Sequence, residues 1–419
     1  MYKIYFKQAI AMLKQNKFIS IITITGTALA IMMIMVIIVT ESIKNISIAP
    51  EINRDKTMYV KNFVRNKKDP NSDYIWCGTL PYEYYKKYLS ELKTPKNISA
   101  VENMWSGDKF MVKKDNTNER FLARTKMVDA SYWEIMSFSF ISGRPFTQEE
   151  FESGLTTAII TDQLAKKVFG NADPLGKGIE IDFKDYKVIG VVKAVPQTFQ
   201  YGYGEMYIPY TSKGGYENRT YHVLSLLNDN RYQQALIDEY RAAERKFNAE
   251  DDEWNLKIQG PYTHRIAQLA RYSNEDPDVG KANKRMIMIF LILLLIPAIN
   301  LSSFSMSRIK RRTEEIGIRK AFGAKKYVIL MQVMYENFIT SLIGGIIGLI
   351  LSYIIVVWLK SWLLGISSDG NIPVGALISI PVFLGVFTAC FLLNILSAGF
   401  PAYRASKMKI VDSLNNKTA

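Results

Sequence analysis

The residue types that could do chemistry are sparse in this sequence, and the first candidate is a glycine-rich segment. A phosphate-binding loop needs two glycines separated by four residues, followed by Lys and a hydroxyl residue. The nearest segment is G-N-A-D-P-L-G-K-G, Gly170–Gly178, with five residues between its first two glycines and Gly178 in place of the hydroxyl residue. This pattern is typical of a glycine that ends a helix, followed by a turn into a strand. We therefore predict no nucleotide site here.

The other candidates are two histidines and a run of acids. No Cys/His cluster of the kind that binds zinc surrounds His222 or His264. Asp251–Glu253 is a run of carboxylates of the kind that is usually solvated, and no Gly-x-Ser-x-Gly elbow is present. We therefore expect a protein that is not an enzyme and holds no metal or cofactor. Cys77 and Cys390 are expected to form no intramolecular disulfide.

The elements that stand out instead are four long apolar runs. A helix needs roughly 20 mostly apolar residues to cross a bilayer. Three of the runs have uncharged cores, and the third in chain order carries only Glu336 near one end. A cleaved signal peptide is the alternative for the first run, but no small-residue cleavage site follows it. We predict four membrane-spanning helices, at residues 18–42, 286–307, 327–360 and 374–400.

The basic residues predict the orientation of these spans. Residues 1–17, 308–326 and 401–419 carry net charges of +4, +6 and +3, nearly all of the formal +14 of the chain. By the positive-inside rule these segments and both termini face the cytoplasm. Residues 1–17 also have one apolar helical face and can lie as an amphipathic helix on membrane lipid. The basic charge is therefore a signal of topology, and we predict no nucleic-acid binding.

Residues 43–285 are then a large extracytoplasmic domain, and residues 361–373 a short external loop. Strand-like and helix-like patterns alternate through the domain without a low-complexity tract, which predicts an α+β fold of two subdomains. The expected strands are 57–64, 98–105, 121–128, 156–161, 178–182, 186–195, 221–227 and 253–258, and the expected helices are 81–93, 131–137, 162–169 and 232–247. A hairpin tip is expected at Lys184 and Asp185.

The cytoplasmic loop carries the most informative motif. E-E-I-G-I-R-K-A-F-G-A, Glu314–Ala324, resembles the signature of the FtsX-like permeases of ABC transporters, the group that includes MacB. F-G-N-A-D-P-L-G-K-G-I at 169–179, Y-K-V-I-G-V-V-K at 186–193 and P-A-Y-R-A-S-K-M-K-I-V-D-S-L at 401–414 agree with it, so the resemblance covers nearly the whole chain.

The resemblance implies a permease dimer whose cytoplasmic loop acts as a coupling helix in a groove of a dimeric ATPase, which binds the ATP. Physically, the loop suits a helix with a hydroxyl cap, acids in its first turn and a glycine at its end. From the residues alone, a helix that only anchors the loop to the membrane surface fits equally well. The residues expected to couple to the ATPase are Thr313, Glu314, Glu315, Ile316, Gly317, Arg319, Lys320, Phe322 and Gly323, with Ile316, Ala321 and Phe322 as its apolar contact surface.

Two features of the spans suggest mechanical linkage. Gly344, Gly345 and Gly348 form a small-residue face that permits close helix packing, either at a dimer seam or within one subunit. Pro297 is expected to kink the second span, which in this family links the coupling loop to the outer domain.

MacB itself carries its ATPase ahead of the permease, whereas about 17 residues precede the first span here, so we expect the ATPase to be a separate subunit. The function expected is mechanotransmission for export or efflux in the bacterial inner membrane, by a homodimer or a heterodimer with a related permease. The resemblance alone suggests a periplasmic adaptor and an outer-membrane channel as further partners. A lipoprotein-release permease, or a receptor or sensor without an ATPase, is the alternative.

Overall fold

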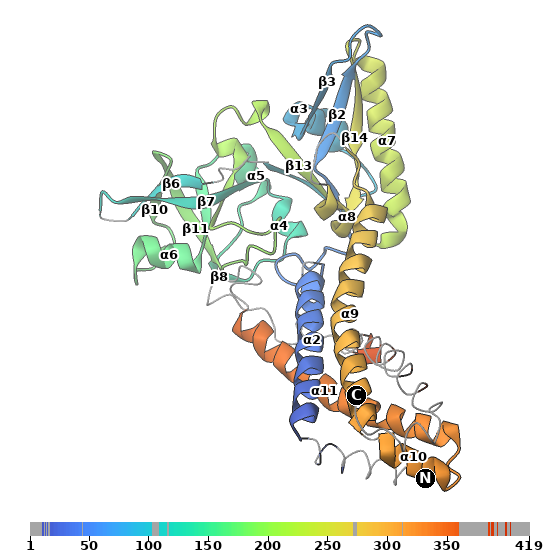
Figure 1. Cartoon of the computed structure of the whole chain (residues 1–419). Helices are drawn as coiled ribbons and strands as arrows, with labels where there is room; N and C mark the ends of the chain where they lie inside the picture. Colours follow the sequence, from blue (N-terminus) through green and yellow to red (C-terminus); the bar gives the residue numbers. More distant parts are fainter. Residues whose placement is uncertain are drawn as a thin grey trace. The chain divides into compact units, whose positions relative to one another are not determined.

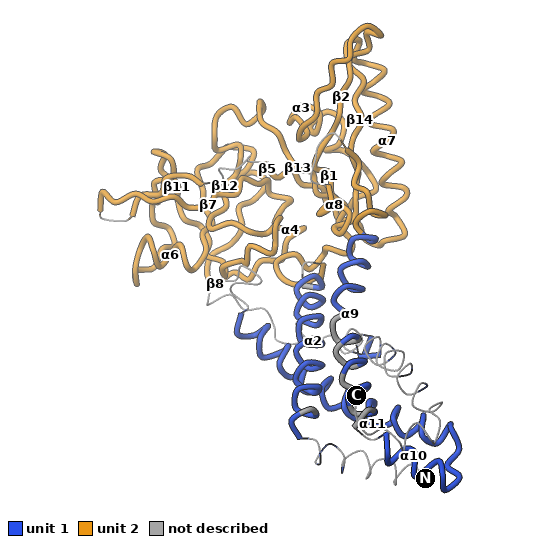
Figure 2. Tube along the Cα trace, in the orientation of Figure 1, with its two compact units in different colours: residues 1–43, 283–363, 372–419 blue, residues 44–282, 364–371 orange. Residues whose placement is uncertain are grey.

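The structure is a computed structural model that describes residues 11, 13, 15, 17–43, 45–102, 109–114, 117–270, 275–311 and 313–359, with residues 384, 385, 387, 388, 392, 399 and 403. The chain divides into two compact units (Figure 2). We call residues 1–43, 283–363 and 372–419 the helical unit, and residues 44–282 and 364–371 the α+β domain. The boundary between them falls inside helix α9 (Val279–Arg311).

The helical unit contains three long helices and one short helix among its described residues. They are α2 (Lys17–Ile43), α9, α10 (Thr313–Ala321) and α11 (Lys326–Trp358). Within the part of the chain that the structure describes, Ser20–Ser42 and Lys326–Trp358 are long and apolar enough to cross a membrane. They coincide with the first and third predicted spans. The predicted second span lies within α9, which continues as a helix through Pro297.

Most of the remaining predicted segments outside the large domain lie outside the described residues. These are the amphipathic helix at 1–17, the external loop at 361–373, the fourth span at 374–400 and the tail at 401–419, apart from the isolated residues given above. Their placement stays a prediction.

The described residues of the α+β domain form three sheets (Figure 1). The largest has seven strands in the order β10-β6-β7-β12-β9-β11-β8, mostly antiparallel but with parallel β9–β11 and β7–β12 pairs. Its strands are β6 (Lys109–Lys113), β7 (Arg120–Val128), β8 (Phe140–Gly143), β9 (Thr157–Thr161), β10 (Gly178–Ile181), β11 (Lys184–Val192) and β12 (Met206–Pro209). Helices α4 (Tyr132–Ile135), α5 (Gln148–Glu152) and α6 (Asp162–Phe169) belong to the same region.

The two smaller sheets complete the domain. One has the order β15-β1-β13-β4, with β5 also paired to β13, and the other has the order β14-β2-β3. Their strands are β1 (Thr57–Val60), β2 (Asn62–Lys67), β3 (Ile75–Gly78), β4 (Leu80–Pro81), β5 (Asn97–Glu102), β13 (Thr220–Leu226), β14 (Trp254–Gln259) and β15 (Tyr262–Thr263). Helix α7 (Gln233–Glu250) packs on β14, and α8 (His264–Leu269) packs on β1 and β15.

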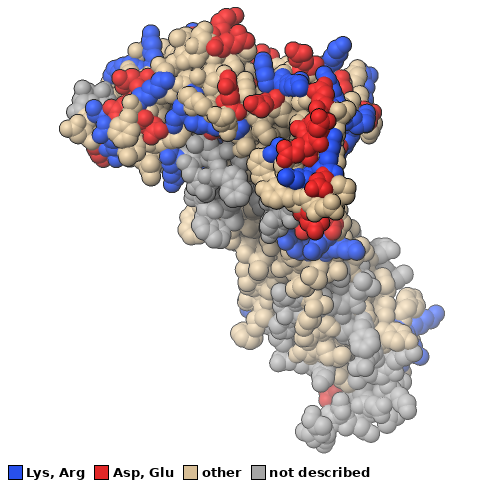
Figure 3. Space-filling view, turned by 90° about the horizontal axis from the view of Figure 1, so that it is seen from above, with Lys and Arg blue, Asp and Glu red and all other residues tan. Residues whose placement is uncertain are grey.

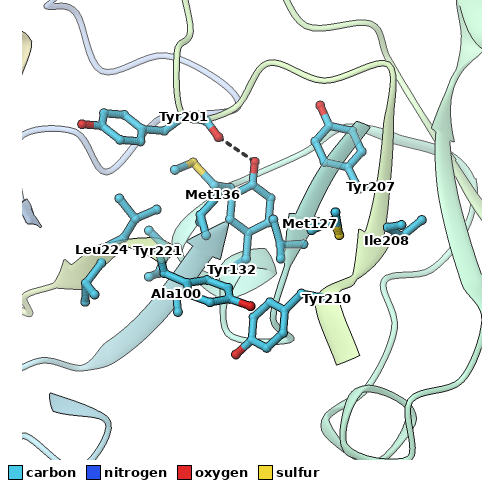
Figure 4. Packing of buried hydrophobic residues seen from close by; sticks show 14 of the residues in the cluster. Ala100, Met127, Tyr132, Met136, Tyr201, Tyr207, Ile208, Tyr210, Tyr221 and Leu224 are labelled. Atoms are coloured by element: carbon cyan, nitrogen blue, oxygen red, sulfur yellow. Dashed lines mark hydrogen bonds between the residues drawn. The ribbon is translucent and has the colours of Figure 1, made fainter. Parts of the chain in front are cut away.

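One aromatic-rich core runs under all three sheets. Figure 4 shows its centre, where Tyr132 lies among Met127, Met136 and Tyr207, with Tyr210 and Tyr221 nearby. Tyr132 is fully buried, and its hydroxyl donates to the backbone oxygen of Tyr201 at 2.9 Å. A buried tyrosine adds a large apolar area but needs such a partner. Because the core is continuous, the division into two subdomains stays a prediction.

Several predicted elements are confirmed and some are wrong in detail. Helix α6 has the predicted bounds, and the hydroxyl of Thr161 caps it by accepting from the amide of Leu164. Gly170, at φ +63°, ends α6 as the glycine pattern predicted. The expected strand 57–64 is two strands, which meet at Lys61, and the expected helix 81–93 is short, made of α3 (Tyr82–Tyr84) and a π-turn at Tyr85–Leu89.

The predicted hairpin tip is wrong by two residues. The turn between β10 and β11 is formed by Asp182 and Phe183, which have φ values of 53° and 64°. Two consecutive left-handed residues match the right-handed twist of the flanking strands. Lys184 and Asp185 pair instead with Ile181 and Glu180 in the ladder.

Candidate functional site: the α9–α11 connection

The predicted coupling segment forms helix α10. Glu314 and Glu315 lie in its first turn, and Arg319 and Lys320 lie in its last turn, as the helix dipole favours. Burial and the nearby charge of Lys326 lower the pKa of Lys320. Thr313 is the first residue of the helix and is buried, and its hydroxyl donates to the carbonyl of Ile309 at 3.3 Å. The hydroxyl therefore joins α10 to the end of α9.

Gly323 ends the segment in a left-handed conformation, with φ at +88°. Its amide donates to the carbonyl of Lys320, and the amide of Ala324 donates to the carbonyl of Arg319, at 2.9 and 3.0 Å. These two bonds form a Schellman motif, which uses carbonyls that the helix end leaves open. Gly323 thus sets where the chain turns from α10 toward α11.

An apolar cluster fastens α10 to both neighbouring helices. Ile316 is only 6% exposed and packs with Ile309 of α9 and with Ile329 and Val333 of α11. Burying an isoleucine side chain contributes about 1.5–3 kcal/mol. Gly317 is also buried beside it. The three helices therefore meet at Ile316.

Arg319 adds a polar connection within the chain. Its guanidinium donates to Gln332 Oε1 at 2.5 Å and also binds the carboxylate of Glu315 one turn away. Gln332 in turn donates to Glu336 at 3.4 Å, and both side chains are buried in α11. The single acid of the predicted third span is thus connected through Gln332 to the coupling segment.

Two large apolar side chains are exposed at the C-terminal end of α10, Ile318 in the helix and Phe322 directly after it. Phe322 is 89% exposed and Ile318 is 49% exposed, and Ala321 and Glu314 are exposed as well. Of the three apolar residues expected on the contact surface, Ile316 is turned into the chain, while Ala321 and Phe322 are accessible. Ile318, which was not predicted, lies on the exposed surface instead of Ile316. Its spacing of four residues from Phe322 could have identified it, because residues four apart lie on one helix face.

The small-residue face of α11 lies against other helices of the same chain. A Cβ atom at Gly348 would lie 2.5 Å from the carbonyl oxygen of Ala28, and one at Gly344 would lie 2.9 Å from the Cβ of Thr27. Both contacts are with α2. A Cβ atom at Gly345 would lie 2.8 Å from the ring of Phe387. In this chain, Gly344 and Gly348 permit the close approach of α2 and α11.

The α+β domain contains a buried polar network that the sequence did not indicate. Glu51 is fully buried and accepts from Arg54 Nε at 2.6 Å and from the amides of Tyr201 and Gly202 at 3.0 and 2.8 Å. Arg54 is also buried, donates to the carbonyl of Ile46 at 2.9 Å and stacks on Phe199. The network therefore ties the segment that follows α2 to the loop at 198–202.

His264, at the start of α8, completes this network. Its Nε2 lies 3.7 Å from Glu51 Oε2, and its ring packs edge-on against Tyr59. Burial, helped by the charges of Arg54 and Lys61, lowers the pKa of His264 to about 3. The imidazole is therefore neutral at physiological pH, as expected of a core histidine. Among the residues that the structure describes, no three His, Cys, Asp or Glu side chains are grouped as metal ligands would be.

Comparison with known proteins agrees with this architecture. Residues 20–243 match the MacB-like periplasmic core domain family, and residues 287–410 match the FtsX-like permease C-terminal family. The chain is 25% identical over 330 residues to the uncharacterized ABC transporter permease YknZ of Bacillus subtilis, covering 78% of each chain. It is 24% identical to the macrolide export ATP-binding/permease protein MacB of Nitrosomonas europaea, covering 78% of this chain and 48% of that protein.

Two further similarities are more limited. The chain is 26% identical to the pyoverdine export ATP-binding/permease protein PvdT of Pseudomonas aeruginosa, over 67% of this chain and 40% of that protein. The extracellular domain of YknZ from Gram-positive bacteria aligns in structure with a TM-score of 0.35 and 19% identity, over 48% of this chain and all of that domain. The match to the periplasmic core domain alone covers more than half of the 419 residues. The chain therefore belongs to the MacB/FtsX family of ABC transporter permeases.

Proposed function

We propose that this chain is the four-span permease subunit of an exporter, in which α10 receives force from a cytoplasmic ATPase and the α+β domain moves on the outer side. What carries the proposal is the packing of α10. The helix is fastened to α9 and α11 through Ile316 and to α11 through Arg319, while Phe322 and Ile318 stay exposed. A helix held in this way passes a displacement to two long helices at once.

The exposed face of α10 is suited to a protein partner. Phe322 and Ile318 lie one turn apart and next to acidic and basic side chains, which matches an apolar centre with a polar rim. In this proposal the ATPase dimer binds the ATP, and the permease contributes no catalytic group. Two of the relatives are named for the export of a macrolide and of pyoverdine, which supports export as the direction.

The proposed membrane arrangement follows the charge distribution and the family. Both termini and α10 lie in the cytoplasm, the α+β domain lies outside the inner membrane, and two permease subunits form a homodimer or a heterodimer. A periplasmic adaptor and an outer-membrane channel are further proposed partners.

Single-cysteine labelling tests the arrangement. With Cys77 and Cys390 replaced by Ser, a membrane-impermeant maleimide should label Phe183→Cys in intact cells and label Ala321→Cys only after lysis; the opposite result would reject the orientation.

Loss of the exposed α10 face is the direct test of coupling. The double variant Ile318→Ser/Phe322→Ser should fold normally because both side chains are exposed, yet it should no longer copurify with a cognate ATPase or stimulate its ATP hydrolysis. The matched control is Phe183→Ser, which removes a 68% exposed phenylalanine from the α+β domain. If the double variant retains both properties, α10 is not the ATPase contact.

A further inference from the structure

The three-stranded sheet of the α+β domain places an arginine between two tryptophans. In the strand register Arg65 of β2 lies opposite Trp76 of β3, and Lys67 lies opposite Trp254 of β14. Residues directly opposite each other, and residues two apart in one strand, project on the same face of a sheet. Arg65, Lys67, Trp76 and Trp254 therefore share one face.

The guanidinium of Arg65 is held by stacking. Its central carbon lies 4.2 Å from the ring centre of Trp76 and 4.4 Å from that of Trp254. Tyr74 packs edge-on against Trp254 with ring centres 5.8 Å apart. A cation between two indole faces is strongly favoured, and two rings restrict its orientation more than one does. Arg65 is thus fixed in place before any ligand arrives.

At least one hydrogen-bond donor of this guanidinium is unused among the described residues. Its Nε is buried and has no hydrogen-bond partner among the described residues. Asp251 and Glu253 act on it only as nearby charges, and burial outweighs them, so the pKa of Arg65 is lowered. A buried donor without a partner is unfavourable. An anion that accepts hydrogen bonds from this guanidinium is therefore favoured.

Two other stacked arginines of the domain, Arg120 and Arg54, differ in this respect. Arg120 lies 5.0 Å from the ring of Phe183, and its Nε and Nη2 donate to Glu180 at 3.1 and 2.7 Å. Arg54 lies 4.6 Å from the ring of Phe199 and binds Glu51. In both cases a carboxylate occupies the guanidinium edge. At Arg65 no carboxylate of the described chain plays this part.

An open pocket of about 570 Å³ lies beside Arg65. Arg65, Lys67, Tyr74, Trp76, Glu253 and Trp254 line it. Tyr74 is 57% exposed and Trp76 is 41% exposed, so aromatic surface is accessible beside the cation. Lys67 adds a second positive charge, although it pairs with Glu253 at 3.5 Å. The volume suits a small organic molecule rather than a bare ion.

We propose that this pocket binds an organic carboxylate, with the carboxylate on Arg65 and an apolar or aromatic body against Tyr74 and Trp76. A planar guanidinium matches a carboxylate with two parallel hydrogen bonds. The exposed rings then cover the rest of the ligand. This site is separate from α10 and does not depend on coupling to an ATPase.

Two fluorinated probes of equal shape test the proposal on the full chain in lipid nanodiscs. 4-Fluorobenzoate carries the carboxylate, and 4-fluorobenzamide is its neutral counterpart. The ¹⁹F NMR signal of 4-fluorobenzoate should broaden when the protein is added, and the broadening should saturate. The affinity of the protein for 4-fluorobenzoate should be at least about tenfold above its affinity for 4-fluorobenzamide, because charge-assisted hydrogen bonds are roughly twice as strong as neutral ones. Equal binding of the two probes, or no saturable binding of benzoate, would overturn the proposal.

Arginine variants test whether 4-fluorobenzoate binds in this pocket. Arg65→Gln should abolish the preference for benzoate, whereas Arg120→Gln, which removes a stacked arginine that already has a carboxylate partner, should leave it unchanged. If Arg65→Gln does not fold, Arg65→Lys keeps the charge but not the planar donors, and should lower the affinity for benzoate several-fold. An unchanged affinity in the folded variant contradicts the proposal. Displacement of benzoate by lower concentrations of inorganic phosphate would identify a phosphate site instead.

Discussion

In the α+β domain charged side chains lie on the surface and aromatic side chains fill the interior, whereas the helical unit exposes apolar side chains along α2, α9 and α11. Figure 3 shows this contrast, with both signs of charge interspersed on the α+β domain and few charged atoms on the described surface of the helices. Water solvates the first kind of surface and lipid the second. The surface of the α+β domain is therefore suited to water, and the surface of the helical unit is suited to lipid.

The two regions also differ in how far their ion pairs are exposed to solvent. Glu51 and Arg54 of the α+β domain are 0% and 1% exposed, whereas Glu315 and Arg319 of α10 are 44% and 37% exposed. A buried charge that loses its partner is strongly destabilising, whereas a half-exposed pair contributes little. The first pair therefore supports the fold, and the second can rearrange at small energetic cost.

The largest predicted effect follows from this difference. Glu51→Gln removes the carboxylate that holds Arg54 and two backbone amides, and should lower the free energy of unfolding of the α+β domain by about 3–5 kcal/mol. Urea unfolding followed by tryptophan fluorescence measures it. Glu315→Gln is the control and should cost less than about 1 kcal/mol. Equal losses of unfolding free energy in the two variants would mean that burial does not determine how much an ion pair contributes to stability.

The second prediction compares one added methyl group in each region. Gly348→Ala forces a Cβ atom against the backbone of α2, and should cost about 1–3 kcal/mol because the backbone must shift. Gly178→Ala in the α+β domain meets no atom within 4 Å and should be nearly neutral. The melting temperatures of the two variants, measured by thermal unfolding in mild detergent, show the difference in stability. If Gly348→Ala instead dissociates a dimer without lowering the melting temperature, the glycine face also forms a subunit seam.

Local patterns explain which elements could be predicted from the sequence. α2 and α11 follow from their long apolar runs, and the end of α6 follows from its glycine at 170. The helix end at Gly323 belongs to the same class. The β10–β11 turn was misplaced because Asp182 and Phe183 adopt left-handed conformations without a glycine to signal them.

Contacts between distant parts of the chain could not be predicted. Glu51 and Tyr201 are 150 residues apart, and nothing in either neighbourhood indicates that they meet. The Arg65 pocket likewise combines three strands, of which β3 was not predicted at all. For α10, the sequence placed Ile316 on the contact surface, and only the packing against α9 and α11 shows that Ile316 is buried.

The buried, neutral His264 of the α+β domain should make the stability of this domain depend on pH. His264 has a pKa of about 3 when folded and about 6.5 when unfolded, so the unfolded state binds more protons between these values. Stability should therefore fall as the pH falls from 6.5 toward 3, with a slope from His264 of up to about 1.4 kcal/mol per pH unit. His264→Asn should show a shallower slope in urea unfolding at a series of pH values.

A second buried group works in the opposite direction and serves as the control for this experiment. Burial raises the pKa of Asp129 to about 6, so the folded state takes up a proton first as the pH falls from 6 to 4. That uptake stabilises the fold at low pH and is present in both proteins, so it cancels in the comparison. Identical slopes for the His264→Asn variant and the parent would show that His264 titrates normally.

The smallest predicted effect concerns the end of α10. Gly323→Ala places a side chain at φ +88° with no atom nearby, so it should cost only the conformational strain, about 1 kcal/mol. Gly323→Asn should cost less, because asparagine tolerates left-handed conformations better than alanine. If α10 transmits force by staying docked on α9 and α11, Gly323→Ala should lower ATPase stimulation more than it lowers the melting temperature of the helical unit. A loss of stability with full stimulation would instead mean that the turn supports folding and not coupling.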